Sequence, residues 1–388
     1  MKILLASDSY AFTTSGVTNV VRTLEEGLRR RGFEVKVLSL SKGKTSYRQG
    51  DDYLIRSSYS FIYPEIRFSF ARSDALLDEL VQWKPDLIHL HTEGSIARMT
   101  RNIAEKTNAP IVMTAHTDYA YYAFGRFHKT WPVRKFMEAL GKRVYRKVDT
   151  VIAPSAKAGS FSQLQAVKDR TVILPNGIHL EKYRKPVSAQ EKEALFRKYG
   201  LTDNGCTLAM ITRVSREKNI MEILRFLPAL FRELPNAQLI IVGDGLDRER
   251  LEAYCRNHQL AGRVVFAGMI PPEEVYRYYA MGDVFVSASQ FEVHSMSYLE
   301  ALAGGLPLVC REDDSLLGVL DSGENGFTYR TEQEFVTAVT TILRDRAALS
   351  RMRENAKRKA DAFSDERFIE NTARLYESIL SRRNASAD

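Results

Sequence analysis

The feature that most constrains the fold of this chain is a regular alternation of short apolar runs with longer segments of helical periodicity. In the first half, apolar runs of strand length lie at residues 2–6, 34–40, 86–90, 110–114, 149–153 and 171–174. In the second half, they lie at residues 206–212, 237–242, 263–267, 283–287 and 306–310. Strands that are apolar at every position are buried on both faces, as in a parallel sheet covered by helices. The alternation therefore predicts an α/β fold with two doubly wound sheets.

A break in this pattern separates the two halves. Pro175-Asn176-Gly177 interrupts it, and the highly charged segment 182–198 follows, which we interpret as a linker. We expect a Rossmann-like domain at residues 1–180, a second one at residues 181–365, and a C-terminal helix over 366–388 that can cross back to the first domain. Ligands of such sheets bind beyond the carboxyl ends of the strands, so two facing domains place a site in a central cleft.

Composition narrows the class of protein and of partner. Apolar residues make up 44% of the 388 and charged residues 27%, as in soluble globular proteins. No apolar run approaches the roughly 20 residues of a membrane span, and the first residues begin a strand rather than a signal peptide, so we expect a cytoplasmic protein. Three scattered cysteines lack metal-ligand spacing, which indicates buried thiols and no metal site. The formal charge of +8 favours nucleic acid, an anionic membrane surface or a phosphorylated substrate.

Two carboxylates eight positions apart mark the most informative stretch, residues 289–310. Glu292 and Glu300 flank Ser295 and Ser297, either of which can cap a short helix that a glycine pair ends. The helix start would offer N–H groups to an anion, Glu292 would accept hydrogen bonds from sugar hydroxyls, and Glu300 would bind a ribose diol. Taken alone, the stretch is better explained as an amphipathic helix with two solvated glutamates.

Two further features follow strands of the second half. Arg213 and Lys218 come after the strand at 206–212, and two cations beside a helix start suit a diphosphate. Gly243-Asp244-Gly245 follows the next strand, where missing side chains would let a flat ring or a phosphate approach the backbone. Surface charges and a simple turn explain each feature at least as well when it stands alone.

Polar residues also follow strands of the first half. Asp8 and Tyr10 close the first strand, and Ser15 and Gly16 open the next helix, where a glycine lets the backbone approach a sugar or phosphate. A plain turn glycine is an equal explanation.

Histidines cluster after the next strands. His116 ends the strand at 110–114 and is followed by Asp118 and Tyr119. A lone histidine is more often structural, but one at a strand end that faces the expected cleft is a catalytic candidate. His89 and His91 flank an apolar strand, so we interpret them either as core residues or as residues that support the site without contacting the ligand.

Together, the second-half motifs resemble the donor-binding half of retaining glycosyltransferases of family four, which have the GT-B fold. The motifs are Arg-x4-Lys after one strand, Gly-Asp-Gly after the next, and Glu-x7-Glu followed by Ala-Leu-Ala-Gly-Gly-Leu-Pro. The resemblance implies that Arg213 and Lys218 hold the donor diphosphate, Glu300 the ribose and Glu292 the transferred sugar. It also implies that His116 lies against that sugar and that no metal is required.

The resemblance and the strand-end positions give three groups of expected residues. Catalysis is assigned to His116, Glu292, Arg213 and Lys218. Donor binding is assigned to Gly16, Arg213, Lys218, Gly243, Asp244, Gly245, Glu292, His294, Ser295, Met296 and Glu300. Acceptor binding is assigned to Asp8, Tyr10, Ser15, Asp118 and Tyr119. Ser295 stands where the family commonly has a glycine, and we expect the donor preference to be encoded there.

The positive charge is concentrated in one segment. Between residues 126 and 147 eight Lys and Arg accompany one Glu, an excess of seven that nearly equals the formal charge of the chain. Aromatic residues lie at or before these cations, as in an interfacial helix among anionic lipid headgroups. We expect membrane contact from Arg126, Lys129, Trp131, Arg134, Lys135, Lys142, Arg143 and Arg146. The alternative is a basic surface helix with its aromatic residues in the core, and no nucleic-acid-binding module accompanies the charge.

A finer resemblance rests on fewer residues. Segments 7–10, 15–17 and 116–119 are most similar to diacylglycerol glucosyltransferases and their phosphatidylinositol mannosyltransferase relatives. This similarity implies retaining transfer of a hexose, with UDP-glucose as donor and a lipid such as diacylglycerol as acceptor, at the inner face of the cell membrane. Two alternatives remain: the same fold and donor with a soluble glycan, small-molecule or protein acceptor, and a nucleotide-sugar-binding protein without catalytic activity.

Overall fold

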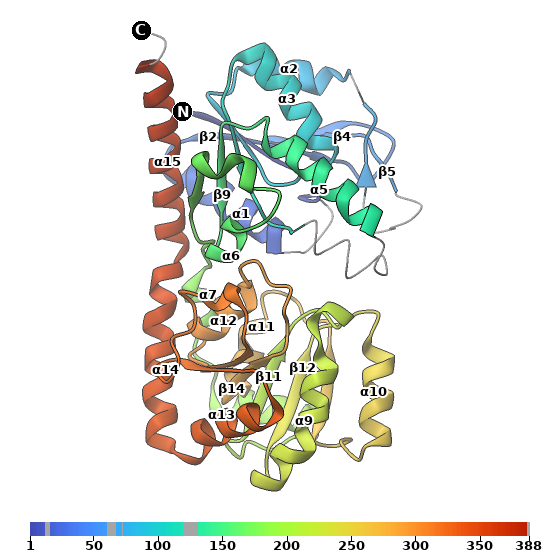
Figure 1. Cartoon of the computed structure of the whole chain (residues 1–388), viewed down its shortest axis with the longest axis vertical. Coiled ribbons are helices and arrows are strands. Elements are labelled where there is room, and N and C mark those ends of the chain that lie inside the picture. The colour runs from blue at the N-terminus through green and yellow to red at the C-terminus, as the bar shows by residue number, and fades with distance from the viewer. Residues whose placement is uncertain (12–15, 60–66, 72, 119–130, 386–388) are drawn as a thin grey trace. The chain divides into compact units, whose positions relative to one another are not determined.

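The computed structural model describes residues 1–11, 16–59, 67–71, 73–118 and 131–385, except for the side chains at 131–134, 136, 137 and 140. These residues form two compact units, each a Rossmann-like α/β domain (Figure 1). Unit 1 comprises Met1–Gly177 and Asp365–Asp388, and unit 2 comprises Ile178–Ser364. The prediction of two doubly wound sheets is confirmed.

The sheet of unit 1 has eight strands in the order β10-β9-β8-β7-β1-β2-β4-β3. Neighbouring strands run parallel, except for β3 and β4, and β5 and β6 form a separate antiparallel pair. The strands are β1 (Lys2–Ser7), β2 (Glu34–Leu40), β3 (Tyr47–Gln49), β4 (Asp52–Ile55), β5 (Ser58–Tyr59), β6 (Arg67–Phe68), β7 (Leu87–Leu90), β8 (Ile111–Thr114), β9 (Thr150–Ala153) and β10 (Thr171–Ile173). Residues 3–6 of the central strand β1 are fully buried, as expected for a strand covered on both faces.

Helices from both ends of the chain cover this sheet. They are α1 (Gly16–Arg30), α2 (Ala75–Trp83), α3 (Ser95–Thr107), α5 (Trp131–Tyr145), α6 (Ala156–Gly159), the short 3-10 helix η1 (Gln165–Arg170) and α15 (Asp365–Ala385). The last helix, α15, packs on α1, where a Cβ added to Gly27 would lie 1.9 Å from Cδ1 of Ile369. The glycine therefore lets the two helices lie in direct contact, and the C-terminal helix belongs to unit 1.

The sheet of unit 2 has six parallel strands in the order β13-β12-β11-β14-β15-β16. The strands are β11 (Thr207–Ile211), β12 (Gln238–Val242), β13 (Val264–Gly268), β14 (Val284–Ser287), β15 (Leu308–Arg311) and β16 (Gly326–Tyr329). The helices are α7 (Leu180–Tyr183), α8 (Ala189–Lys198), η2 (Arg216–Lys218), α9 (Ile220–Glu233), α10 (Arg248–Asn257), α11 (Val275–Met281), α12 (Met296–Ala303), η3 (Asp314–Leu316), α13 (Glu332–Arg344), α14 (Arg346–Ala360) and η4 (Asp361–Phe363).

The segment that we interpreted as a linker, residues 182–198, is part of unit 2 instead. It contains the end of α7 and all of α8, which begins with a capping box between Ser188 and Glu191. Phe196 is 2% exposed and packs in the core of unit 2. The interpretation was wrong because the charges occupy the solvent side of a helix whose other side is packed.

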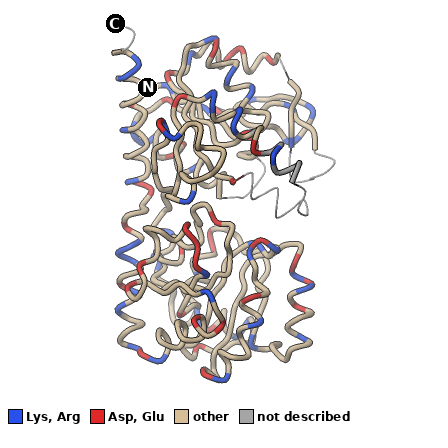
Figure 2. The backbone as a smooth tube through the Cα atoms, in the orientation of Figure 1, with Lys and Arg blue, Asp and Glu red and all other residues tan. Residues whose placement is uncertain are grey.

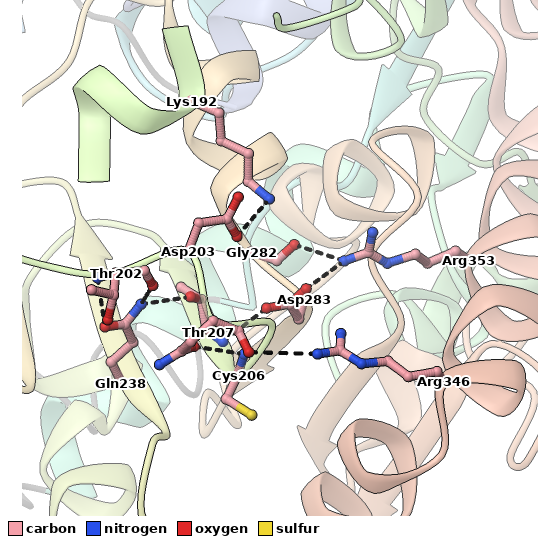
Figure 3. Close-up of polar contacts among 11 residues, drawn as sticks. Lys192, Thr202, Asp203, Cys206, Thr207, Gln238, Gly282, Asp283, Arg346 and Arg353 are labelled. Carbon is pink, nitrogen blue, oxygen red and sulfur yellow. Dashed lines mark hydrogen bonds and ion pairs between the residues drawn. The ribbon is translucent and has the colours of Figure 1, made fainter. Parts of the chain in front are cut away.

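A polar network aligns the amino ends of three strands in unit 2 (Figure 3). Asp283, which is 4% exposed, accepts hydrogen bonds from the backbone N–H of Thr207 at 2.9 Å and from the Arg353 guanidinium at 2.8 Å. The Gln238 side-chain amide donates to the Thr207 hydroxyl at 2.8 Å. The network therefore joins β11, β12 and β14 at the ends opposite to the candidate site, and leaves their carboxyl ends to carry it.

Candidate functional site

The strand order of unit 2 reverses between β11 and β14. The chain continues from β11 to β12 on one side, whereas β14 pairs with β11 on the other. Such a switch point leaves a crevice at the carboxyl ends of the two strands, where ligands of doubly wound sheets bind. Arg213 follows β11 and Glu292 follows β14, so both lie at this edge of the sheet.

Lys218 and Glu292 form an ion pair at the switch point. Lys218 ends η2, just before α9, and its Nζ donates to Oε1 of Glu292 at 2.5 Å. The Lys218 side chain is 19% exposed and the Glu292 side chain 12%, so water screens their attraction less than it would on the surface. On the same loop, Arg213 is exposed to solvent. The arrangement offers two cations and one carboxylate to a ligand at this edge.

The residues at the start of α12 differ in part from expectation. Ser295 occupies the N-cap position, but its hydroxyl lies 3.1 Å from the Ser297 hydroxyl and does not cap a backbone N–H. The His294 ring is buried 5.7 Å from the Phe363 ring, and burial lowers the pKa of His294 to about 4. A contact between His294 and the sugar donor would therefore be made by the backbone of His294. Met296, the first residue of the helix, is half-buried.

Glu300 is held by two tyrosines that lie far from it in the sequence. The hydroxyl of Tyr279 in α11 donates to Oε2 of Glu300 at 2.7 Å, and the Tyr183 hydroxyl at the end of α7 also bonds the carboxylate. Burial raises the pKa of Glu300, and both hydrogen bonds oppose this shift because they favour the charged form. A carboxylate has about four lone-pair sites, so two remain for a vicinal diol.

The sequence analysis missed Tyr183 and Tyr279. These residues reach Glu300 only because α7 and α11 pack beside α12. Neither tyrosine belongs to a motif, and apolar periodicity shows that a helix is buried but not which helix it meets. We find no signal in the chain that would have indicated this contact.

Gly243 and Gly245 let two strand-end loops lie against each other. Both have positive φ angles, and an added Cβ would lie 1.9 Å from the Thr212 carbonyl oxygen at Gly243 and 2.3 Å from the Val214 carbonyl oxygen at Gly245. The glycines are therefore needed for contact with the loop that follows β11, whatever they contribute to a ligand. Asp244 forms an ion pair at 3.0 Å with an arginine of α10.

Unit 1 has its own switch point, between β1 and β7. His91 follows β7, and His116 lies just beyond the adjacent strand β8. Nδ1 of His91 is 3.1 Å from Nε2 of His116, which is half-buried. His89 and His91 are each 1% exposed, which agrees with both interpretations of them, as core residues and as residues behind the site.

Asp8, which directly follows strand β1, caps the start of helix α3. Its carboxylate accepts hydrogen bonds from the Ile96 N–H at 3.1 Å and the Thr92 hydroxyl at 2.5 Å at the start of α3. The N-cap residue Gly94 has no side chain to do this, and a Cβ there would lie 2.6 Å from Oδ2 of Asp8. Burial raises the pKa of Asp8, and the hydrogen bonds oppose the shift. Asp8 thus has a structural role, to which any acceptor contact would be additional.

The other residues expected near the acceptor vary in exposure. Tyr10 is largely buried, and its hydroxyl donates to Glu25 of α1. Asp118 is half-exposed after β8. Gly16, which we expect at the donor instead, is the exposed first residue of α1. The remaining two expected residues, Ser15 and Tyr119, lie outside the described part of the chain.

One face of α5 and the turn after it is basic. Lys135, Arg143 and Arg146 are exposed and Lys142 is half-buried, whereas Tyr145 is fully buried and donates to Glu93 at 2.5 Å. Figure 2 shows the Lys and Arg positions along this segment. The expected contacts Arg126 and Lys129 lie outside the described residues, as do the side chains of Trp131 and Arg134. Within the described ranges, every helix is too short or too polar to span a bilayer.

Among the described side chains, no three His, Cys, Asp or Glu are grouped as metal ligands would be.

The two Rossmann-like α/β units, each built on a mainly parallel sheet, have the architecture of the GT-B fold. The family model "Glycosyltransferase Family 4" matches residues 14–182, and "Glycosyl transferases group 1" matches residues 191–359. The chain belongs to glycosyltransferase family 4.

Two relatives carry the same name, alpha-monoglucosyldiacylglycerol synthase. The protein from Acholeplasma laidlawii is 26% identical over 396 residues, which cover 99% of this chain and 98% of the relative. The protein from Streptococcus pneumoniae is 30% identical over 346 residues, which cover 88% of this chain and 78% of the relative.

Solved structures share the fold. Sucrose-phosphate synthase from Thermosynechococcus elongatus has a TM-score of 0.78 at 20% identity, covering 98% of this chain and 99% of the other. HepE from Anabaena in complex with UDP and glucose has a TM-score of 0.76 at 19% identity, covering 97% of this chain and all of the other.

Proposed function

We propose that this glycosyltransferase moves glucose from UDP-glucose to the hydroxyl of a membrane lipid such as diacylglycerol, with retention of the anomeric configuration. The observation that carries the proposal is the shielded Lys218–Glu292 pair beside Arg213 at the switch point of unit 2. It supplies cations for a diphosphate and a carboxylate for sugar hydroxyls at one edge of the sheet. The names of the two relatives support glucose, a diacylglycerol acceptor and an α-linked product.

In the proposed reaction the leaving group receives most of the stabilisation. Arg213, Lys218 and the start of α12 act on the diphosphate, whose negative charge grows as the glycosidic bond breaks. Glu292 and His116 orient the sugar. Glu292 is paired with a lysine and is therefore assigned to hydroxyl binding rather than to covalent attack. The acceptor oxygen approaches from the side that the diphosphate leaves, and the leaving phosphate takes its proton.

The donor ribose is assigned to Glu300. Its carboxylate is fixed by Tyr183 and Tyr279 and keeps acceptor capacity for both ribose hydroxyls. Gly243, Asp244 and Gly245 shape the neighbouring loop, and Ser295 at the N-cap of α12 is where we place the preference for one sugar. In unit 1, Asp118 and the carboxyl end of β1 are assigned to the acceptor side, and Gly16 is assigned to the donor.

The basic face of α5 is assigned to the membrane. Lys135, Arg143 and Arg146 are exposed, while Tyr145 anchors the helix in unit 1. Each cation near an anionic membrane surface contributes about 1 kcal/mol of attraction. This face would hold the enzyme at the inner surface of the cell membrane, where a lipid acceptor is available.

Vesicle cosedimentation and lipid glucosylation test the acceptor assignment together. We expect Lys135→Glu/Arg143→Glu/Arg146→Glu to lose binding to anionic vesicles and most transfer to diacylglycerol in those vesicles. The matched control is Lys198→Glu/Arg232→Glu/Arg256→Glu, which reverses three exposed cations of unit 2 and should retain both. If the α5 variant keeps vesicle binding and lipid transfer, the membrane assignment fails and a soluble acceptor becomes the better proposal.

A further inference from the structure

Two buried histidines and one half-buried histidine form a contact chain at the carboxyl ends of β7 and β8. The His89 and His91 rings are 4.0 Å apart between centroids, and the His91 and His116 rings are stacked at 5.4 Å. His89 lies in β7 and His91 directly follows it, and His116 lies just beyond the neighbouring strand β8. The proposed reaction uses His116 and leaves the other two without a role.

His89 is fully hydrogen-bonded. Its Nδ1 is 2.6 Å from the Tyr376 hydroxyl of α15, and its Nε2 is 2.7 Å from the Thr114 hydroxyl. Hydroxyl groups both donate and accept, so His89 is satisfied with its proton on either nitrogen. The His89 ring is held in place by these two hydrogen bonds and packs against the His91 ring.

His91 is hydrogen-bonded on one side only. Its Nδ1 meets Nε2 of His116 at 3.1 Å, whereas its own Nε2 is buried and has no hydrogen-bond partner among the described residues. Burial, together with the neighbouring His89 and His116, lowers the pKa of His91 well below its usual value. The ring is therefore neutral and carries a single proton.

Only one tautomer of the His91 ring avoids leaving a buried N–H group without an acceptor. If the proton were on Nε2 of His91, a buried N–H would be left unpaired, which proteins rarely tolerate. If it is on Nδ1, that N–H donates to Nε2 of His116. His116 must then accept at Nε2, and when neutral it carries its proton on Nδ1.

We propose that His91 is a positioning residue that fixes His116 in the tautomer with its proton on Nδ1. The proposal concerns the residue to which the proposed function assigns the transferred sugar, and it rests on that assignment for its consequence in catalysis. Because Nε2 of His116 accepts from His91, that nitrogen is not a proton acceptor for the substrate. Any hydrogen bond from the His116 ring to the sugar is then donated by its Nδ1–H.

Nitrogen NMR of the full chain tests the tautomer directly. The protein is labelled with 15N-histidine, and long-range 1H–15N spectra are recorded near pH 7.5 without substrate, with the His91 and His116 signals assigned from His91→Asn and His116→Gln. We expect Nδ1 of His116 to be protonated and Nε2 to be an acceptor. A protonated Nε2 on neutral His116 would overturn the proposal.

Two substitutions at one position separate positioning from packing. In His91→Asn the side-chain amide can still donate to His116, whereas His91→Phe keeps a ring but has no donor. We expect kcat for glucosyl transfer to fall about tenfold in the Phe variant, as for loss of one hydrogen bond, and less than threefold in the Asn variant, with KM unchanged in both. Equal losses in both variants, or a change in KM alone, would contradict the proposal.

The two experiments fail independently. The spectra contain no substrate, so they report the tautomer even if glucose is not the transferred sugar. If the wild-type chain transfers no sugar, the proposed function fails while the spectra still decide the tautomer. If His91→Phe does not fold, the wild-type spectra and the Asn variant decide the proposal.

Discussion

At the residue scale, the central contact is the ion pair between Lys218 and Glu292. We assign these two groups to different parts of one substrate, and they are joined to each other by a hydrogen bond of 2.5 Å. The pair keeps both side chains ordered and limits the reorganisation needed when a donor binds. The ion pair also predicts that removing Lys218 and removing Glu292 have different effects on UDP binding.

We expect Lys218→Ala to reduce kcat by about 100-fold to 1,000-fold, as for loss of one fixed group that stabilises transition-state charge, and to weaken UDP binding. Glu292→Gln should lower kcat by a similar factor but strengthen UDP binding, because Lys218 is released and a negative charge near the diphosphate is removed. Titration calorimetry with UDP and initial rates measure the two effects. Lys192→Ala, which breaks an ion pair with Asp203, is the matched control. Equal UDP affinities in all three variants would contradict the assignment.

A half-buried carboxylate in unit 1, that of Asp52, predicts a pH dependence of stability. Burial and the nearby Glu25 raise the pKa of Asp52 to about 6. The folded chain therefore binds this proton more tightly than the unfolded chain, and the contribution of Asp52 to stability falls as the pH rises from about 4 to 6. We expect Asp52→Asn to raise the free energy of unfolding by about 1 kcal/mol at pH 7.5, after allowance for partial exposure.

Urea unfolding at pH 7.5 and pH 4 checks this prediction. The gain of Asp52→Asn should disappear at pH 4, where the wild-type carboxyl is protonated in the folded chain. Asp169→Asn alters an exposed carboxyl elsewhere in unit 1 and should show no such gain. An Asp52→Asn effect that is equal at both pH values would mean that the charge is not its cause.

At the element scale, the start of α3 depends on a residue 88 positions away. Asp8 accepts the Ile96 N–H that the N-cap Gly94 cannot bind with a side chain. We expect Asp8→Ala to lower the free energy of unfolding of unit 1 by about 1–2 kcal/mol, as for loss of a cap. Thermal unfolding measures the loss, and Asp74→Ala, which removes the side-chain cap of α2, is the reference. No loss in Asp8→Ala would show that the α3 cap is dispensable.

Most elements could be predicted because burial leaves a pattern along the chain. The central strands, such as β1 and β12, each have four consecutive apolar residues and were predicted within about two residues of their ends. The short strands β3, β4, β5, β6 and β16 were missed. All residues of β3 are exposed, and it contains no apolar run. Its strand conformation is set by pairing with β4, which no local pattern records.

The candidate site could be predicted in part for the same reason. Strand ends show which residues lie at one edge of a sheet. This was enough to predict that Arg213, Lys218 and Glu292 lie at the same edge, where Lys218 and Glu292 form an ion pair. The tyrosines at Glu300 and the buried ring of His294 depend on how helices pack. Those contacts are decided by shape in three dimensions and could not be read from spacing.

At the scale of the whole molecule, unit 1 is built from both ends of the chain. The contact of α1 with α15 depends on Gly27, which faces Ile369. We expect Gly27→Leu to displace α15 and to cost about 1–3 kcal/mol, as for an overpacked contact. Hydrogen exchange over residues 365–385 should become faster.

The partner substitution provides the control for this contact. Adding Ile369→Ala to Gly27→Leu should restore part of the protection, because it makes room for the new side chain. Unchanged exchange in Gly27→Leu would show that α15 is not held at this point.

The central claim is that this family 4 glycosyltransferase transfers glucose to a lipid hydroxyl. The most direct measurement is mass spectrometry of the products after purified protein is incubated with UDP-glucose, UDP-galactose or GDP-mannose and vesicles containing diacylglycerol. We predict a monohexosyl diacylglycerol from UDP-glucose, α-linked by NMR, and its loss in Lys218→Ala. A sugar transferred only to soluble acceptors, a β-linked lipid, or a product that persists in Lys218→Ala would contradict the account.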